Sequence, residues 1–329
     1  MVHIRSKFSA ITLAAGIATL TGGAAAHADT YPSQPIRVIV PFAPGGSTDI
    51  TTRIVTQRMS QELGKPIVVE NKGGAGGAIG ATEAARAKPD GYVLSIATVS
   101  TLAVNPACRP NDLPYDAVND FAPVTNFVNV PNVIEVNPKF PAKDFKTFLA
   151  VLKDNPGKYS YGSSGTCSVL HLFGEAFKLA TDTDPVHIPY KGSGPAVIDA
   201  VGGQIEILFD NLPSSMPQIL GGNLRPLAVA WPERLPSMPD VPTLAEEGYP
   251  QLNQPAWYGL LAPKGTPPEI IKTLHAAAVV ALKDPKVIAA LEKQGAFPSG
   301  NTPEEFGAEI KEQYEWAKDV VAKGNITLE

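Results

Sequence analysis

Apolar and polar positions follow a regular order along this chain, in which short β-branched runs precede stretches with helical spacing. The first run, residues 35–42, reads PIRVIVPF, and apolar residues then recur at helical intervals up to Gly64. Gly64 stands where a C-cap glycine ends a helix. Strands that alternate with helices are typical of parallel sheets, so the pattern predicts an α/β protein with doubly wound sheets.

The pattern restarts after Asn132, and this restart predicts two lobes. The expected strands are residues 35–42, 66–71, 92–98, 133–137, 159–162, 186–190, 205–210, 224–230 and 257–262. The expected helices are residues 50–63, a segment ending near 87, residues 145–152, 168–179 and 196–201, and three more after residue 268. Residues 124–137 and 257–262 are expected to carry the chain between lobes. We therefore predict a first lobe of residues 29–132 and 256–329 and a second lobe of residues 133–255.

The first 28 residues have the pattern of a cleaved secretory signal peptide. Arg5 and Lys7 give a positive start, an apolar stretch follows, and the small-x-small sequence Ala26-His27-Ala28 ends it. The stretch is too short and too often interrupted to span a membrane. We therefore expect export, in a bacterium to the periplasm.

Charge and cysteine content narrow the functional classes. The chain carries 27 basic and 32 acidic residues, a net charge of −5, without long runs of one sign. Such a field does not favour nucleic-acid or anionic-membrane binding. Cys108 and Cys167 are the two cysteines. In an exported protein an even count favours a disulfide between them, and two buried thiols are the alternative.

The turn after the first strand, PFAPGGSTD, is the main candidate for chemistry. Two glycines permit close backbone approaches, and Ser, Thr and Asp suit the start of a helix. Bare N–H groups at a helix N-terminus bind anions without a cationic side chain. An ordinary strand-to-helix turn remains the alternative. The candidate ligand-binding residues here are Phe42, Ala43, Pro44, Gly45, Gly46, Ser47, Thr48 and Asp49.

Similar turns follow strands of the second lobe, in YGSSGTCSVLH, YKGSG and ILFDN. Because ligands of open α/β sheets gather beyond the carboxyl ends of strands, these turns could face the first one across a cleft. Routine helix capping is the alternative for each turn taken singly. The candidate residues are Ser163, Ser164, Gly165, Thr166, Ser168, His171, Tyr190, Lys191, Gly192 and Asp210.

The sequence offers little support for a catalytic site, a metal site or a nucleotide-binding site. The glycine-rich segment 73–80 has isoleucine at position 79, where a dinucleotide fingerprint needs glycine. Beyond the predicted signal peptide the chain contains His171, His187 and His275. No two of them have the sequence spacing that is typical of metal ligands. We expect no cofactor and no metal. A secreted hydrolase that uses the 163–168 turn with His171 is the alternative from another class.

The motifs together resemble the Bug/TctC family of periplasmic receptors of tripartite tricarboxylate transporters. They are VPFAPGGSTD, GGAGGAIGA, LPYDAVNDFAPVT, YGSSGTCSVLH, PYKGSGPAVIDAVGGQIEILFDN and WYGLLAPKGTP, in order along the whole mature chain. The resemblance implies a type II periplasmic-binding-protein fold that closes on a small carboxylate. It also implies inner-membrane transporter subunits as partners, a monomer, and, as an alternative role, a sensor that engages a kinase.

One residue, Asp210, narrows the class of ligand that we expect. An ionised Asp210 near the site would repel a ligand that bears carboxylates alone and would attract an ammonium group. We therefore expect an acidic amino acid such as aspartate or glutamate, with a plain dicarboxylate as the alternative.

Overall fold

The computed structural model describes residues 1–3 and 31–324, so nearly all of the predicted signal peptide lies outside the described residues. From Tyr31 onward the chain forms one compact unit. Its helices are α1 (Ser47–Leu63), α2 (Ala78–Ala85), α3 (Asn105–Cys108), α4 (Phe145–Asp154), α5 (Val169–Thr181), α6 (Ser193–Gly202), α7 (Leu212–Leu220), α8 (Pro268–Leu282), α9 (Pro285–Lys293) and α10 (Pro303–Gly324), with short helical turns η1 (Ala75–Gly77), η2 (Ser100–Val104) and η3 (Pro250–Leu252).

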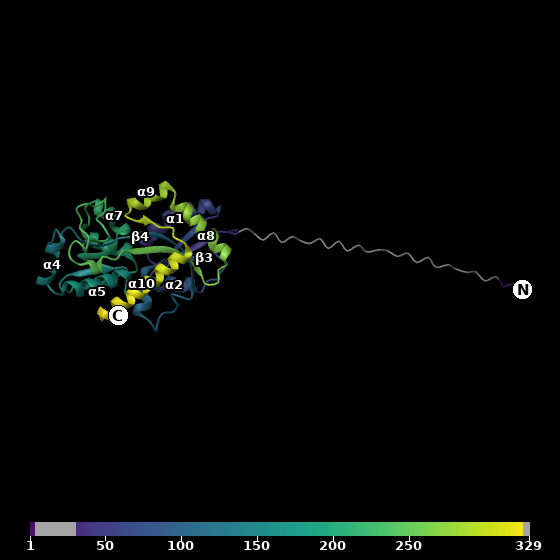
Figure 1. Ribbon diagram of the computed structural model, residues 1–329, viewed down its shortest axis with the longest axis horizontal. Helices are drawn as coiled ribbons and strands as arrows, with labels where there is room; N and C mark the ends of the chain where they lie inside the picture. Colours follow the sequence, from purple (N-terminus) through teal and green to yellow (C-terminus); the bar gives the residue numbers. More distant parts are fainter. Residues whose placement is uncertain (4–30, 325–329) are drawn as a thin grey trace. The chain divides into compact units, whose positions relative to one another are not determined.

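Two separate sheets form the cores of two lobes. The first sheet has the order β11-β4-β10-β3-β1-β2 and the second has the order β7-β6-β8-β5-β9. The strands of the first are β1 (Ile36–Val40), β2 (Ile67–Asn71), β3 (Val93–Thr98), β4 (Phe121–Val130), β10 (Ala256–Pro263) and β11 (Phe297–Pro298). Those of the second are β5 (Asn132–Val136), β6 (Ser160–Ser163), β7 (Val186–Pro189), β8 (Ile207–Asn211) and β9 (Arg225–Ala230). Helices α2 and α8 lie with the first sheet, and α4 and α5 with the second (Figure 1). The predicted α/β class with two lobes is confirmed.

The sheets are mixed, although the sequence pattern indicated parallel ones. β1 pairs in parallel with β2 and β3, and β6 pairs in parallel with β7 and β8. β10 runs antiparallel to β3 and β4, and β5 runs antiparallel to β8 and β9. The antiparallel pairs follow from the path of the chain. The chain leaves the first sheet along β4, enters the second along β5, and returns to the first along β10. The strands that cross between the sheets therefore run antiparallel to their neighbours.

Helix α1 begins directly beyond the first strand and buries a face rich in threonine. Thr51, Thr52 and Thr56 are buried, and each hydroxyl donates to the carbonyl oxygen four residues earlier, over 2.8, 2.6 and 2.8 Å. These bonds satisfy hydroxyl groups that burial would otherwise leave without partners. Gly64 ends the helix in the left-handed conformation, with φ 65°, as its position in the sequence predicted.

The segments that cross between the lobes are joined by polar and aromatic contacts. Asn132 Nδ2 donates to the carbonyl oxygen of Gln254 over 2.7 Å, which links the two crossings directly. Trp231, at the end of β9, stacks on Phe297 of the first sheet with ring centroids 4.8 Å apart. The division into residues 29–132 with 256–329 and residues 133–255 remains a prediction about the units that move.

Gly259 of β10 offers a test of how tightly the first lobe is packed. A Cβ at this position would lie 2.2 Å from the buried Phe306 ring and 2.7 Å from the carbonyl oxygen of Thr125. We expect Gly259→Ala to lower the free energy of unfolding by about 1–3 kcal/mol, because the ring and the strand would have to move apart.

Urea unfolding of both Gly259→Ala and the matched variant Gly202→Ala measures this difference. A Cβ at Gly202, the last residue of α6, meets nothing within 4 Å. That variant should therefore change stability by less than about 1 kcal/mol, in the stabilising direction. Equal stability of the two variants would contradict the packing described for β10.

Candidate functional site

A small cavity lies where strands of both sheets end. The residues that line it come from both lobes: Phe42, Ser47, Thr48, Thr98, Val99, Ser100, Ser164, Val169, Ser193, Asn211, Ala256 and Tyr258. Its volume is about 10 Å³, room for roughly one water molecule. A larger space of about 590 Å³ lies between α5 and α10. Its lining is mainly apolar, with Asn132, Gln251, Gln254, Asp319 and Lys323 as polar members.

Helix N-termini surround this cavity. Ser47 begins α1, Ser100 begins η2, Val169 begins α5, Ser193 begins α6 and Asn211 is the N-cap of α7. Four of the five, all except α5, have no side-chain cap. The first N–H groups of a helix have no partner within it and carry a partial positive charge. The cavity therefore lies in a positive field, although none of its lining residues is charged.

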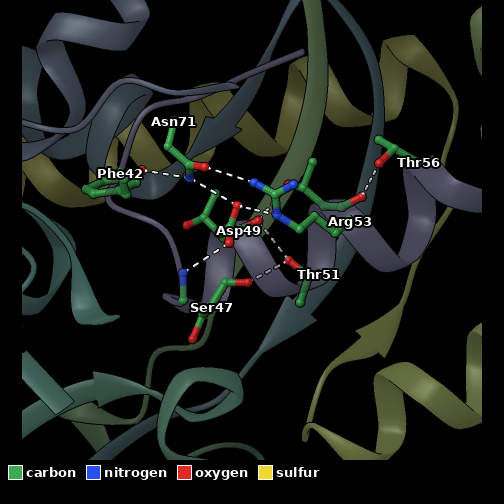
Figure 2. A network of polar contacts seen from close by, with 10 residues as sticks. Phe42, Ser47, Asp49, Thr51, Arg53, Thr56 and Asn71 are labelled. Atoms are coloured by element: carbon green, nitrogen blue, oxygen red, sulfur yellow. Dashed lines mark hydrogen bonds and ion pairs between the residues drawn. The ribbon is translucent and has the colours of Figure 1, made fainter. Parts of the chain in front are cut away.

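A network centred on Asp49 holds the loop between β1 and α1 in place (Figure 2). The Asp49 carboxylate accepts from Gly45 N over 3.0 Å, from Asn71 Nδ2 over 3.0 Å and from Arg53 Nε over 2.8 Å. Asn71 also donates to the carbonyl oxygen of Phe42 over 3.0 Å. Asp49 thus points into the first lobe and not into the cavity. It stiffens the loop that presents the N-terminus of α1.

The lobes are closed on each other through backbone contacts at this loop. Ala43 N donates to the carbonyl oxygen of Lys191 over 3.0 Å. A Cβ at Gly194 would lie 2.4 Å from the carbonyl oxygen of Pro44, and one at Gly73 would lie 2.7 Å from that of Lys191. Such distances exclude any larger residue without displacing backbone.

Side-chain hydrogen bonds reinforce the closure. Ser47 Oγ donates to the carbonyl oxygen of Asn211 over 2.6 Å, and it accepts from Ser214 N over 2.9 Å. On the other side of the cavity, Val169 N donates to Ser100 Oγ over 2.9 Å. Two pairs of helix starts, α1 with α7 and η2 with α5, are therefore joined across the boundary between the lobes.

The candidates from the first-strand turn divide into two groups. Phe42, Ser47 and Thr48 line the cavity. The others, Ala43, Pro44, Gly45, Gly46 and Asp49, do not line it and instead form the loop and its contacts with the second lobe.

Of the candidates in the second lobe, Ser164 lines the cavity. Ser168 caps α5 by accepting from His171 N over 3.2 Å, and Tyr190 donates to Asp199 over 2.7 Å. The remaining candidates, Ser163, Gly165, Thr166, His171, Lys191, Gly192 and Asp210, do not line the cavity either. The sequence located the turns, but not which side chain of each turn faces inward.

The histidine proposed for a hydrolase lies elsewhere. His171 stacks on His187 with ring centroids 3.7 Å apart, and its Nδ1 accepts from Cys167 N over 3.3 Å. Burial lowers the pKa of His171 to about 4 and that of His187 to about 3. Ser163, whose hydroxyl lies 2.7 Å from His187 Nε2, has 0% of its surface exposed. This Ser–His contact is closed to a substrate.

The predicted disulfide is wrong for this structure, in which Cys108 and Cys167 remain thiols. The two side chains are hydrogen-bonded to each other, which raises the pKa of Cys108 and lowers that of Cys167. Cys108 ends α3 in the first lobe, whereas Cys167 precedes α5 in the second. A disulfide would therefore join the two lobes. Neither the expected cellular compartment nor the even number of cysteines indicates where the two cysteines lie in the fold.

Eight lining residues were not among the candidates: Thr98, Val99, Ser100, Val169, Ser193, Asn211, Ala256 and Tyr258. Of these, Val169, Ser193 and Asn211 lie in turns that the sequence had singled out. The small polar run after β3, TVSTL, was a usable signal, because it repeats the strand-to-helix turn of the other sites. Tyr258 gave none, since it lies inside an apolar strand. Its hydroxyl is near Ser47 and Thr48, and burial raises its pKa.

The described part of the chain shows neither a metal site nor a membrane span. No group of three His, Cys, Asp or Glu residues in it could hold a metal ion. None of the helices between residues 31 and 324 is long and apolar enough to cross a bilayer.

Comparison with known proteins agrees with this architecture. Residues 51–326 match the model of the tripartite tricarboxylate transporter family receptor, TctC. Protein BugT of Bordetella pertussis is 40% identical over 306 residues, which cover 92% of this chain and 94% of BugT. A solved structure described as a periplasmic transporter is 75% identical, with a TM-score of 0.90, over 91% of this chain and 100% of that one.

Two solved relatives carry ligands. One is an R. palustris protein with adipate, 32% identical with a TM-score of 0.87, over 90% of this chain and 99% of that one. The other is MatC of Rhodopseudomonas palustris with bound malate, 34% identical with a TM-score of 0.85, over 88% of this chain and 100% of that one.

The two-lobed fold and the cavity between the lobes define a solute receptor of the periplasmic-binding-protein class. The chain belongs to the TctC family, the receptors of tripartite tricarboxylate transporters, which confirms the family that its motifs resembled.

Asp49→Asn tests whether the carboxylate braces the loop. The amide keeps the shape but loses the charge that Gly45 N, Asn71 and Arg53 share, so the free energy of unfolding should fall by about 1–3 kcal/mol. Glu62→Gln, which removes an exposed carboxylate paired with Arg58 on the same helix, should change it by less than about 1 kcal/mol. Denaturant titration compares the two. Equal stability of the two variants would contradict the bracing role of the Asp49 carboxylate.

Proposed function

We propose that this protein captures a small dicarboxylate between its lobes and delivers it to the membrane subunits of a tripartite transporter. The family is one of solute-binding receptors, and this supports transport over catalysis. Export to the periplasm and a monomeric state form part of the proposal.

The observation that carries the proposal is the ring of helix N-termini around an uncharged cavity. Each hydrogen bond from an N–H or hydroxyl group to a carboxylate contributes roughly 1.5–3 kcal/mol. A micromolar ligand requires about 8 kcal/mol, so three or four such bonds suffice. The positive field of helix N-termini needs no cationic side chain, so a protein of net charge −5 can bind an anion there.

The closed cavity favours small, flexible acids over bulky aromatic ones. Its volume of about 10 Å³ is less than any dicarboxylate occupies, so the lobes must part slightly around a bound solute. A slim chain needs less separation than a ring. The relatives with adipate and malate support a dicarboxylate.

The structure shifts the balance away from the acidic amino acid favoured by the sequence. That preference required Asp210 at the ligand, but Asp210 is fully buried and does not line the cavity. The Ser193 side chain, which lines the cavity, lies near its carboxylate. An acidic amino acid therefore becomes the second candidate, reached by Asp210 only through a serine.

Calorimetric titration of protein that has been unfolded and refolded to remove carried-over solute tests the function. The panel is succinate, malate, aspartate, glutamate, citrate, benzoate and NAD. We expect one-to-one binding of a dicarboxylate with a Kd of about micromolar order and no heat with NAD. Heat from benzoate alone, or from NAD alone, would overturn the proposal.

Two serines of one loop provide a matched pair of variants. Ser164 lines the cavity, whereas Ser168 caps α5. Ser164→Ala should weaken dicarboxylate binding by about tenfold, through the loss of one hydrogen bond to a charged group, and leave stability unchanged. Ser168→Ala should instead lower stability by about 1 kcal/mol, the cost of losing an N-cap. Calorimetry measures binding and thermal unfolding measures stability for both variants. A loss of affinity in Ser168→Ala together with a loss of stability in Ser164→Ala would refute the site.

A further inference from the structure

Two acidic side chains lie side by side in the core of the second lobe, directly behind the cavity. Val133 of β5 pairs with Asp210 of β8. Glu135, two residues further along β5, therefore lies on the same face of the sheet as Asp210. Both residues have 0% of their surface exposed. The face is covered by α7, whose Ser214 and Ser215 are buried with them.

The polar atoms of this cluster are incompletely paired. Asp210 Oδ2 accepts a short hydrogen bond from Ser214 Oγ. Among the described residues no hydrogen bond of normal geometry reaches four buried atoms, Glu135 Oε1 and Oε2, Asp210 Oδ1 and Ser215 Oγ, although the side chains of Ser193 and Ser215 lie near the carboxylates. Buried polar groups without partners are costly, and two neighbouring buried carboxylates cannot both stay ionised. A proton held between the two acids would satisfy the cluster and remove the repulsion.

The electrostatic setting agrees with a retained proton. Burial and the nearby charge of Asp210 raise the pKa of Glu135 well above its usual range. Burial raises the pKa of Asp210 to about 6, against the opposing effect of Ser193, Ser214, Asn211 N and Ser215. Asp210 has more donors around it than Glu135 has, so the single negative charge belongs on Asp210 and the proton on Glu135.

Two serines connect Asp210 to the cavity. The Ser193 side chain lies near the Asp210 carboxylate and also lines the cavity. Ser214 Oγ lies 2.9 Å from Ser47 Oγ, another lining residue. From the first lobe, Tyr258 of β10 is the titratable group that faces Asp210. The buried pair is thus one hydroxyl away from the space that a solute would occupy.

We propose that Glu135 and Asp210 share one proton and, through the hydroxyl of Ser193, decide whether the second-lobe wall of the cavity offers an acceptor or a donor to the solute. With Asp210 ionised, the hydroxyl of Ser193 points its proton toward the carboxylate and turns a lone pair to the cavity. The wall then favours a solute with a donor group next to its carboxylate, such as a hydroxyl or an ammonium. A second proton on Asp210 frees a hydroxyl proton for the cavity, and the wall then favours a bare carboxylate.

The shared proton can be detected without any ligand. Infrared spectra of the whole protein should show the carbonyl stretch of a protonated carboxylic acid at neutral pH, and the band should grow as the pH falls through about 6 and Asp210 protonates. Glu135→Gln should reduce the band at neutral pH. The control Glu206→Gln, whose carboxylate accepts from Ser160 at the start of β6, should leave it intact.

The effect on the wall is measured with two acids that differ by one hydroxyl, malate and succinate. This second experiment rests on the proposed function. At about pH 8 we expect malate to bind about tenfold more tightly than succinate, and we expect this ratio to approach one at about pH 5. Asp210→Asn should abolish the preference at every pH, because the amide can donate to a serine. Glu135→Gln should keep it, because the amide is as neutral as the acid that it replaces.

The outcomes separate the two proposals. A neutral-pH band unchanged by Glu135→Gln would overturn the shared proton whatever the ligand. A malate-to-succinate ratio that does not change with pH or in Asp210→Asn would overturn the role of the wall. If neither acid bound while the band behaved as expected, the proposed function and the wall assignment would fail and the shared proton would stand.

Discussion

The arrangement of this protein depends on the direct approach of backbone from one lobe to backbone of the other. Around the β1–α1 loop the carbonyl oxygen of Pro44 lies 2.4 Å from the place of a Cβ at Gly194, and that of Lys191 lies 2.7 Å from the place of a Cβ at Gly73. Because the main chains touch, the first turns of helices from both lobes reach the same small volume. Their donors converge there without any charged side chain. Larger residues at these glycines would separate the lobes and scatter the donors.

Most of the fold could be predicted from the sequence, because strand and helix periodicities are local properties. Gly64 marked the end of α1, and the restart of the pattern after Asn132 marked the second lobe. The direction of β5 and β10 could not be predicted in this way. It depends on the path of the chain between two sheets, which no window of neighbouring residues records.

The candidate site was predicted at the level of turns and not of side chains. Ser47, Thr48 and Ser164 line the cavity, but Asp49 and His171 turn away from it to brace a loop and to stack on a ring. A turn brings several polar residues to one place, and only tertiary packing decides which of them points inward. Glu135 shows the same limit. Its charge inside an apolar strand was visible, whereas its neighbour Asp210 is distant in sequence and close only in the folded sheet.

The small closed cavity has a kinetic consequence. A solute enclosed on all sides by two lobes has no exit while they remain together, so its residence time is the waiting time for opening. Opening must break the contact of Ala43 with Lys191 and the bonds of Ser47, which are the same for every solute, and also the bonds of the solute to the two lobes. The first part sets a minimum barrier for release, and the second adds to it for a solute of higher affinity. A membrane partner that separates the lobes would lower both parts and hasten release.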